Sequence, residues 1–345
     1  MTTGLDELYR SLKRLDAFRD LPREALEPFA TKGVSHDHVR IRGRGLVVRV
    51  PRFSQWKMPP PRMLAYETAA FARAAASGHV PALIDVIPAG DPVPTGALIV
   101  QEVPGRPPAG PEDFHAMAGA LAALHTLAVP RPAARPPLLS HDRPVAATLA
   151  VIEEQASYLT GARLEPAARS ALEAELDWAR GLAGTPEDHG FRLALVGTDT
   201  HPGNFLIDDA GKAWFVDLEK AVYGAAPIDL AHATLAVSVG WDPDAPAAPS
   251  RELVRAFYRH YLDLVDADAR AAFAPWLMPM RRLTWLRTMT WLARWRADWA
   301  ETQPVVQRNP ALLAHAERHI AASFGPDAIA AARSQWLGPD PLELV

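Results

Sequence analysis

Three oxygen-bearing side chains, two of them acidic, stand near one another in the middle of the chain. Asp199 and Asn204 belong to the segment 199–204 (DTHPGN), and Asp217 belongs to the segment 216–219 (VDLE). Two short apolar runs separated by the turn-rich stretch 208–212 (DDAGK) predict an antiparallel hairpin between them. Such a hairpin brings Asn204, just before its first strand, beside Asp217, just after its second. The loop that carries Asp199 can fold back over the same point.

These residue types favour one kind of chemistry. Carboxylate and amide oxygens suit a hard cation such as Mg²⁺ and suit Zn²⁺ poorly. A carboxylate beside such a cation can accept a proton from an incoming hydroxyl. An Asp, an Asn four intervening residues later and a second metal-binding Asp form the arrangement that kinases use for phosphoryl transfer. Asp199 is therefore the candidate base, and Asn204 and Asp217 are the candidate metal ligands.

The order of these motifs resembles the aminoglycoside phosphotransferase and choline kinase-like family, small-molecule relatives of protein kinases. The resemblance rests on DTHPGN at 199–204, VDLE at 216–219 and IDLA at 228–231. It implies a catalytic role for Asp199, Mg²⁺ ligation by Asn204 and Asp217, and a nucleotide, ATP or GTP, as phosphoryl donor. The family's loop begins with His-Gly, where this chain has Gly197 and Thr198.

The resemblance extends to the region upstream of residue 110. Arg49 in the run 46–52 takes the place of the family's phosphate-gripping cation, and Glu67 on the following helix is similar to the glutamate that pairs with that cation. Residues 33–37, with Ser35 among them, are similar to the loop that covers the phosphates. The segment from Gln101 to Val103 is similar to the hinge whose backbone meets the adenine. The resemblance covers about residues 30–240.

The elements that must position these residues change character along the chain. The first hundred residues read as strands with one inserted helix at 63–77, preceded by two short amphipathic helices at 6–16 and 22–30. The glycine-containing segment 43–45 predicts a hairpin turn. Strands are predicted at 38–41, 46–50, 82–87 and 97–103.

Beyond the proline- and glycine-rich boundary at 101–110, helices dominate except for the β segment at 194–216. Helices are predicted at 114–127, at two places within 145–182 and in about five segments after residue 241. We therefore expect an α/β (α+β) fold that is bilobal and protein-kinase-like. A nucleotide-binding lobe spans 1–102 and a helical lobe spans 103–345, with a core at about 106–240 and an acceptor-side subdomain at about 241–345.

Four tryptophans share one predicted helix with five arginines. Two interpretations stay open: a core stripe with arginines extending past it, or an acceptor pocket whose ring faces stack on a substrate. Residues 277–300 carry one acidic residue, Asp298, against the five arginines. Because an aminoglycoside is a polycation, this charge favours a neutral or anionic acceptor. The residues are Trp285, Trp291, Trp295 and Trp299 with Arg281, Arg282, Arg287, Arg294 and Arg296.

Composition excludes several classes. The 345 residues contain no cysteine, which removes disulfides, thiol nucleophiles and cysteine metal sites. Lys+Arg 36 against Asp+Glu 40 leaves no basic excess for nucleic-acid binding. The first ten residues show no signal peptide and no run is long enough to span a membrane, so a cytoplasmic protein with no membrane partner is expected. The sequence does not indicate an oligomeric state.

The sequence therefore predicts a small-molecule kinase that moves the γ-phosphoryl group to an alcohol, with a nucleotide and a small-molecule acceptor as its partners. Two alternatives stay open. One is a catalytically silent relative that binds nucleotide as a regulator or scaffold. The other is transfer of the nucleotidyl group in place of the phosphoryl group. Asp229, at the start of an otherwise apolar helix, is expected to cap backbone groups or to brace the loop that carries Asp199. His125 is expected to be a buried histidine whose hydrogen bonds are satisfied.

Overall fold

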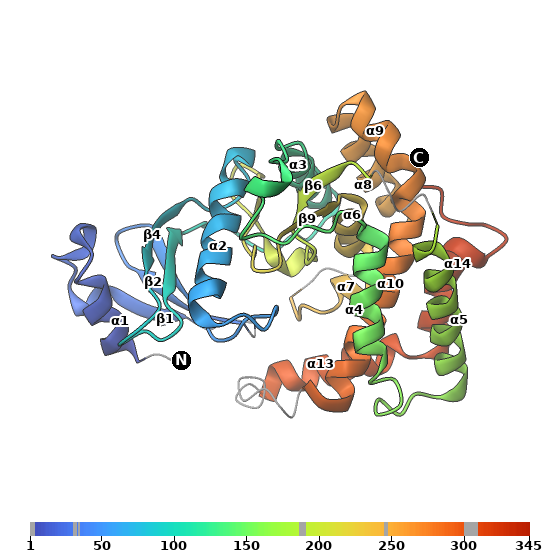
Figure 1. The fold of residues 1–345 in the computed structure, drawn as a ribbon, viewed down its shortest axis with the longest axis horizontal. Coiled ribbons are helices and arrows are strands. Elements are labelled where there is room, and N and C mark those ends of the chain that lie inside the picture. Colours follow the sequence, from blue (N-terminus) through green and yellow to red (C-terminus); the bar gives the residue numbers. More distant parts are fainter. Residues whose placement is uncertain (1–3, 30–32, 34, 186–190, 245–247, 300–309) are drawn as a thin grey trace.

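The computed structural model describes residues 4–29, 33, 35–185, 191–244, 248–299 and 310–345. An antiparallel sheet lies at one end of the molecule and a helical assembly at the other (Figure 1). This bilobal arrangement is the kinase-like fold that the motifs predict. Val34 of the predicted covering loop and the side chain of Trp299 lie outside the described part.

The sheet has the strand order β1-β2-β3-β5-β4, and every neighbouring pair is antiparallel. Its β2–β3 hairpin turns at 43–45, as expected, and Gly43 and Gly45 adopt φ values of 75° and 62° that suit glycine. The strands are β1 (Leu26–Phe29), β2 (His36–Ile41), β3 (Leu46–Pro51), β4 (Leu83–Ile87) and β5 (Ala97–Gln101).

The helix predicted at 22–30 is wrong in its described part. Residues 23–25 form a single 3-10 turn, and Leu26–Phe29 forms the edge strand β1, paired with β2. A short apolar run does not distinguish helix from strand by periodicity alone. Here the segment forms a strand because its backbone pairs with the otherwise unpaired edge of β2. Pro28 is tolerated because β1 itself lies at the edge of the sheet.

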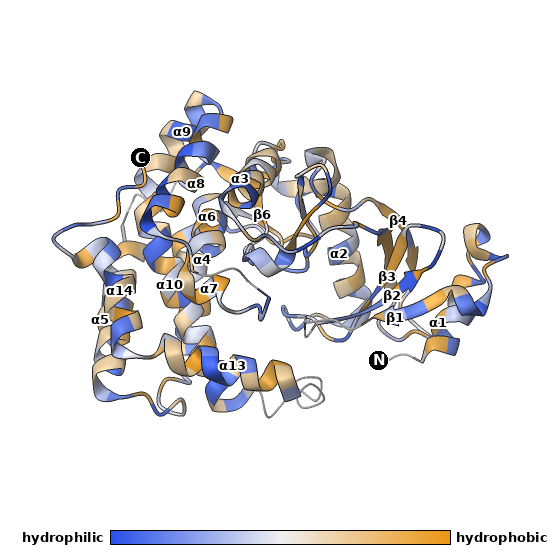
Figure 2. Ribbon diagram, turned by 180° about the vertical axis from the view of Figure 1, so that it is seen from behind, coloured by the Kyte–Doolittle hydropathy of each residue, from blue (hydrophilic) through white to orange (hydrophobic). Residues whose placement is uncertain are grey.

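Helices cover both faces of the sheet. α1 (Leu5–Leu12) buries Leu8 against one face, in a core that includes Val48. α2 (Pro60–Ala74) covers the other face, toward which Arg49 points because side chains alternate along β3. Figure 2 shows hydrophobic colours on the strands of this sheet, consistent with burial between two layers. The alternation therefore sends Arg49 toward the helical part of the molecule.

The helical part contains two small strand pairs that carry the candidate loop. β6 (Leu193–Val196) pairs with β9 (Val222–Ala225), and β7 (Phe205–Ile207) pairs with β8 (Ala213–Phe215) in the predicted hairpin. α10 packs against both α4 and α6. The helices are α3 (Pro111–His125), α4 (Pro144–Ala156), α5 (Pro166–Ala183), α6 (Pro227–Thr234), α7 (Ala236–Val239), α8 (Arg251–Leu264), α9 (Ala267–Phe273), α10 (Leu277–Arg294), α13 (Pro310–Ser323) and α14 (Pro326–Leu337).

Within the described residues, no helix is both long enough and apolar enough to span a lipid bilayer.

Candidate active site

The backbone of the loop between β6 and β7 is hydrogen-bonded to a buried carboxylate. Asp229, at the start of α6, accepts hydrogen bonds from the backbone N–H groups of Gly197 and Thr198, both at 2.7 Å. His125 Nε2 lies 3.0 Å from the same carboxylate, and its Nδ1 lies 2.9 Å from the Tyr261 hydroxyl. The bracing role predicted for Asp229 and the satisfied buried state of His125 are confirmed.

Packing explains why the loop begins with Gly197. A Cβ atom at this position would lie 2.6 Å from the ring of Phe215, on β8, and 2.9 Å from the side chain of Thr200. The bulk that a larger residue would bring is supplied by Phe215, two residues before Asp217. The loop therefore packs directly against β8, the strand that ends just before the candidate metal ligand Asp217.

Thr198 has a left-handed backbone conformation, with φ at 57°. A β-branched residue is strained there. Its hydroxyl donates to the carbonyl of Lys220 at 3.0 Å, and its own carbonyl accepts from Arg287 Nη1 at 3.0 Å. These two bonds hold the residue that precedes Asp199.

Asp199 lies in a cluster of basic side chains. Its Oδ2 is 2.6 Å from Lys220 Nζ, and its Oδ1 is 3.7 Å from His232 Nε2 and 3.9 Å from His201 Nε2. Burial alone would raise the pKa of Asp199, but the charge of Lys220, followed by those of the two histidines, lowers it below its usual range. Asp199 is therefore ionised and able to accept a proton, as a base must be.

The hairpin brings Asn204 next to the segment that ends in Asp217. Asn204 Nδ2 donates to the backbone carbonyl of Asp199 at 2.7 Å, and the Asn204 carbonyl accepts from Val216 N at 3.0 Å. This arrangement leaves the Asn204 side-chain oxygen free to act as a ligand. An amide oxygen of Asn204 and a carboxylate of Asp217, both on residues that line one cavity, fit Mg²⁺, which usually keeps waters and phosphate oxygens as its other ligands.

Arg49 reaches the same point from the sheet. Its Nη2 lies 2.8 Å from Asp217 Oδ1, and its Nη1 donates to the Val216 carbonyl at 2.9 Å. The side chain is 7% exposed, and Nε has no partner among the described residues. The predicted phosphate-gripping cation is therefore directed at the candidate metal ligand.

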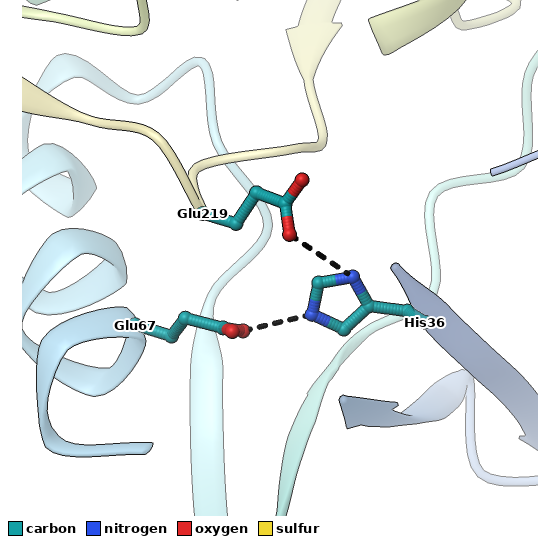
Figure 3. A group of neighbouring side chains, drawn as sticks. All are labelled: His36, Glu67 and Glu219. Carbon is teal, nitrogen blue, oxygen red and sulfur yellow. Dashed lines mark hydrogen bonds and ion pairs between the residues drawn. The ribbon is translucent and has the colours of Figure 1, made fainter. Parts of the chain in front are cut away.

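The expected pairing of Arg49 with Glu67 is wrong. Glu67 lies 2.9 Å from His36 Nε2, whereas Glu219 lies 3.8 Å from His36 Nδ1, so the imidazole joins two carboxylates (Figure 3). His36 on β2 pairs with Glu67 of α2, whereas Arg49 pairs with Asp217 and the Val216 carbonyl. The identity of His36 as a bridging group could not be predicted because it depends on three distant segments.

The charges of this His36 bridge (His36, Glu67 and Glu219) support one another. Burial lowers the pKa of His36, and so does the charge of Arg49, but the charge and hydrogen bond of Glu67 together with the charge of Glu219 raise it, so the net shift is upward. Burial and the charge of Asp217 raise the pKa of Glu219 to about 7. The two carboxylates approach opposite ring nitrogens, which is the geometry of a hydrogen-bonded bridge.

A cavity of about 490 Å³ joins most of these residues. Its walls include Asp199, Asn204, Asp217, Arg49 and Ser35. The predicted hinge residues Gln101 and Val103 also line it, together with Val47 and Val100 of the sheet. The remaining predicted residue, Glu67, lines a separate small cavity beside Trp56 and Tyr66 and is connected to the main cavity through His36.

Ser35 is tied to the bridge rather than exposed on a loop. Its hydroxyl donates to Glu219 Oε1 at 3.0 Å and accepts from Gln55 Nε2 at the same distance. The backbone N–H and C=O of Val103 pair with no other described residue. They are therefore available to form hydrogen bonds with a ligand in the cavity.

The side of the cavity formed by the helical part distinguishes the two interpretations of the tryptophan-rich helix, the core stripe and the acceptor pocket. Trp285 and Trp295 are 2% exposed and belong to the core, whereas Trp291 lines the cavity with Trp241. Of the arginines on α10, only Arg287 lines it. The core interpretation is therefore confirmed for two tryptophans, and the charge that faces the cavity from this helix comes from one arginine.

Sequence reasoning did not single out Lys220, His232 or His36. Lys220 directly follows the VDLE segment, so its proximity to Asp199 was open to prediction once the loop was folded back over the hairpin. His232 lies one turn after Asp229 on α6, and its orientation toward Asp199 depends on how that helix packs.

The sheet, the helical lobe and the cavity between them define a kinase-like phosphotransferase. The chain matches the Phosphotransferase enzyme family over residues 26–276 and belongs to that family. None of the curated protein sequences matches it.

Several solved structures share its fold. The ethanolamine kinase of Plasmodium vivax aligns with a TM-score of 0.60 at 14% identity, covering 94% of this chain and 89% of the kinase. The choline kinase of Cryptosporidium parvum Iowa II aligns at 0.58 and 13% identity, covering 92% and 97%. A GDP and kanamycin complex of an aminoglycoside phosphotransferase aligns at 0.59 and 14% identity, covering 92% and 99%.

Proposed function

We propose that this protein transfers the γ-phosphoryl group of ATP or GTP to a hydroxyl of a small molecule. The observation that carries the proposal is the convergence of Asp199, Asn204, Asp217 and Arg49 on one cavity. The similar structure with bound GDP and kanamycin supports a nucleotide and a small acceptor as ligands. We place the lobe boundary at residues 102/103 and the acceptor-side subdomain at about 241–345.

In this mechanism the nucleotide base lies between the sheet and the hinge, against Gln101 and Val103, and Ser35 lies on the phosphate side. Arg49 neutralises phosphate charge, and Asn204 with Asp217 holds Mg²⁺. When bound, Mg²⁺ neutralises phosphate oxygens. Glu67 positions this part of the site through His36.

Asp199 orients the acceptor hydroxyl and receives its proton. The acceptor oxygen forms a bond to the γ-phosphorus while the bond to the β,γ-bridging oxygen breaks, and the nucleoside diphosphate leaves with that electron pair. Lys220 lies beside Asp199 and keeps this carboxylate ionised until it takes the proton. The chemistry needs little beyond positioning and charge neutralisation, which these side chains supply.

The acceptor is neutral or anionic, because Arg287 faces the helical half of the cavity and Asp199 is already paired with Lys220. We place the reaction in the cytoplasm. The rival function is a nucleotide-binding regulator without transfer activity, for which Gly197 and the covering loop with its one glycine, Gly33, are the main support. The base beside both metal ligands argues against it, since holding a nucleotide requires no such carboxylate.

The test is consumption of ATP and GTP against a panel of alcohols, sugars, nucleosides and antibiotics, with mass spectrometry of each product. A product heavier by one phosphoryl group supports the proposal, and a nucleotidyl adduct contradicts it. Asp199→Ala is expected to lower turnover by roughly 10²–10⁴ while nucleotide binding is kept. Normal turnover by this variant would remove Asp199 from its role as base.

A further inference from the structure

The helical half of the cavity contains a half-buried cation with unused donors. Arg287, on α10, makes one hydrogen bond to a described residue, from Nη1 to the Thr198 carbonyl at 3.0 Å, and forms no ion pair with a described carboxylate. Burial lowers the pKa of Arg287, and the charges of Asp199 and Asp229 oppose that shift. A guanidinium stays charged in proteins, and its remaining N–H groups suit a planar, bidentate oxyanion.

Two other ionisable groups in this half are already paired or neutral. Asp199 is paired with Lys220 at 2.6 Å. Burial lowers the pKa of His232 to about 3, so its ring is neutral near pH 7. Asp242 is an acidic group that also lines the cavity, and it accepts a hydrogen bond from the backbone N–H of Asp244 at 2.8 Å. Of the two cations Lys220 and Arg287, Arg287 is the one that forms no ion pair with a described carboxylate.

Two polar atoms beside it also lack partners. Ser238 and His232 line this half of the cavity, and Ser238 Oγ and His232 Nδ1 are buried without a hydrogen bond to any described residue. Because buried polar atoms are nearly always hydrogen-bonded, these two require a polar partner, either an ordered water or a ligand group. The facing wall is apolar and includes Trp241 and Trp291, whose ring centroids are 4.6 Å apart at 81°. A ligand for this half needs both an oxyanion and an apolar body.

We propose that Arg287 binds a carboxylate of the acceptor, and that the acceptor is a hydroxy acid with an apolar or aromatic body packed on Trp241 and Trp291. This inference rests on the function proposed above and specifies its acceptor class. Arg287 is bonded to the residue that precedes Asp199, so the carboxylate and the reacting hydroxyl lie within a few bonds of each other. The same contact rejects a cationic amino alcohol of similar size by charge repulsion.

The experiment measures binding by calorimetry in two steps. The first step titrates a non-hydrolysable ATP analogue with Mg²⁺, and failure here counts against the proposed function itself. The second step, on the nucleotide-loaded protein, compares each carboxylate with its neutral partner: lactate with propane-1,2-diol, 3-phenyllactate with 3-phenylpropane-1,2-diol, and indole-3-lactate with its diol. Phenylalaninol serves as the cationic probe.

We expect at least one hydroxy acid to bind about 10- to 100-fold more tightly than its diol, the range for a charge-assisted pair. Arg287→Gln should remove that preference and Arg287→Lys should restore part of it, while Arg294→Gln, on the same helix but outside the cavity lining, should keep it. If no hydroxy acid binds more tightly than its diol, or if phenylalaninol binds best, the proposal is wrong.

Kinetics separate this role from two others. With an accepted hydroxy acid, Arg287→Gln should raise KM for that acceptor far more than it lowers kcat, and it should leave KM for the diol nearly unchanged. An equal loss of kcat with charged and neutral acceptors would instead place Arg287 on the transferred phosphoryl group or on loop support, and would overturn the proposal.

Discussion

At the scale of the residue, the site depends on how basic neighbours control the ionisation of a half-buried carboxylate. Asp199 is 20% exposed at its side chain and has Lys220 at 2.6 Å, so the carboxylate is stabilised in its charged form even though burial opposes it. Asp199 affects Lys220 in turn. Burial lowers the pKa of Lys220, but the charges of Asp199 and Glu219 raise it, and the net shift is upward. A charged pair of this kind keeps the base ready over the whole working pH range.

Removal of Lys220 should therefore appear in the pH profile. A base works only when ionised, so activity falls as the pH drops through its pKa. In Lys220→Met, burial raises the pKa of Asp199, and the acidic limb of kcat/KM should move upward by about 1–3 pH units. Lys212→Met, in the β7–β8 turn, is the matched control and should leave the limb in place. An unchanged limb in Lys220→Met would show that Lys220 does not set the ionisation of Asp199.

At the scale of the element, the loop and the hairpin act as one packed unit. Gly197 has no room for a side chain because Phe215 fills the space. Gly197→Ala should destabilise the protein by about 1–3 kcal/mol through overpacking. In a Phe215→Leu background the same substitution should cost less, which a double-mutant cycle by urea denaturation can measure. Additive effects would mean that the two residues do not share this space.

The His36 bridge makes the corresponding link between β2, α2 and the segment after β8. His36→Ala leaves Glu67 and Glu219 buried without their shared partner, which should cost about 3–5 kcal/mol at pH 7.5. Adding Glu67→Gln to His36→Ala should recover part of this loss, because one of the two uncompensated charges is removed. His115→Ala on α3 is the control. If the double variant is as unstable as the sum of the single variants, the bridge does not stabilise the fold in this way.

Local sequence predicts the elements far better than it predicts the bridges between them. The β7–β8 hairpin and the β2–β3 turn follow from turn residues a few positions apart, so both are confirmed. β9 was missed because Val222–Ala225 is four residues long and is defined by its pairing with β6. Glu67 was assigned to Arg49 because no local pattern pairs it with His36, 31 positions away.

At the scale of the whole molecule, the cavity lies between two lobes that meet through charged contacts. Arg49 of the sheet bonds to Asp217 of the helical lobe, and Trp56 Nε1 donates to the Glu219 carbonyl at 3.2 Å. A nucleotide with Mg²⁺ between the lobes would add contacts on both sides. Ligand binding should therefore stabilise the molecule as a unit rather than one lobe alone.

The expected effect follows from linkage. A Mg²⁺–ATP analogue at one hundred times its Kd adds about 2.7 kcal/mol to the free energy of unfolding, which corresponds to about 4 °C in Tm for a chain of this size. Chelation with EDTA should abolish most of the shift, because Asn204 and Asp217 then hold no metal. Asp217→Asn should lose the Mg²⁺ dependence, whereas Asp209→Asn, exposed in the β7–β8 turn, should retain it. Equal stabilisation with and without Mg²⁺ in the unsubstituted protein would favour the nucleotide-binding regulator over the kinase.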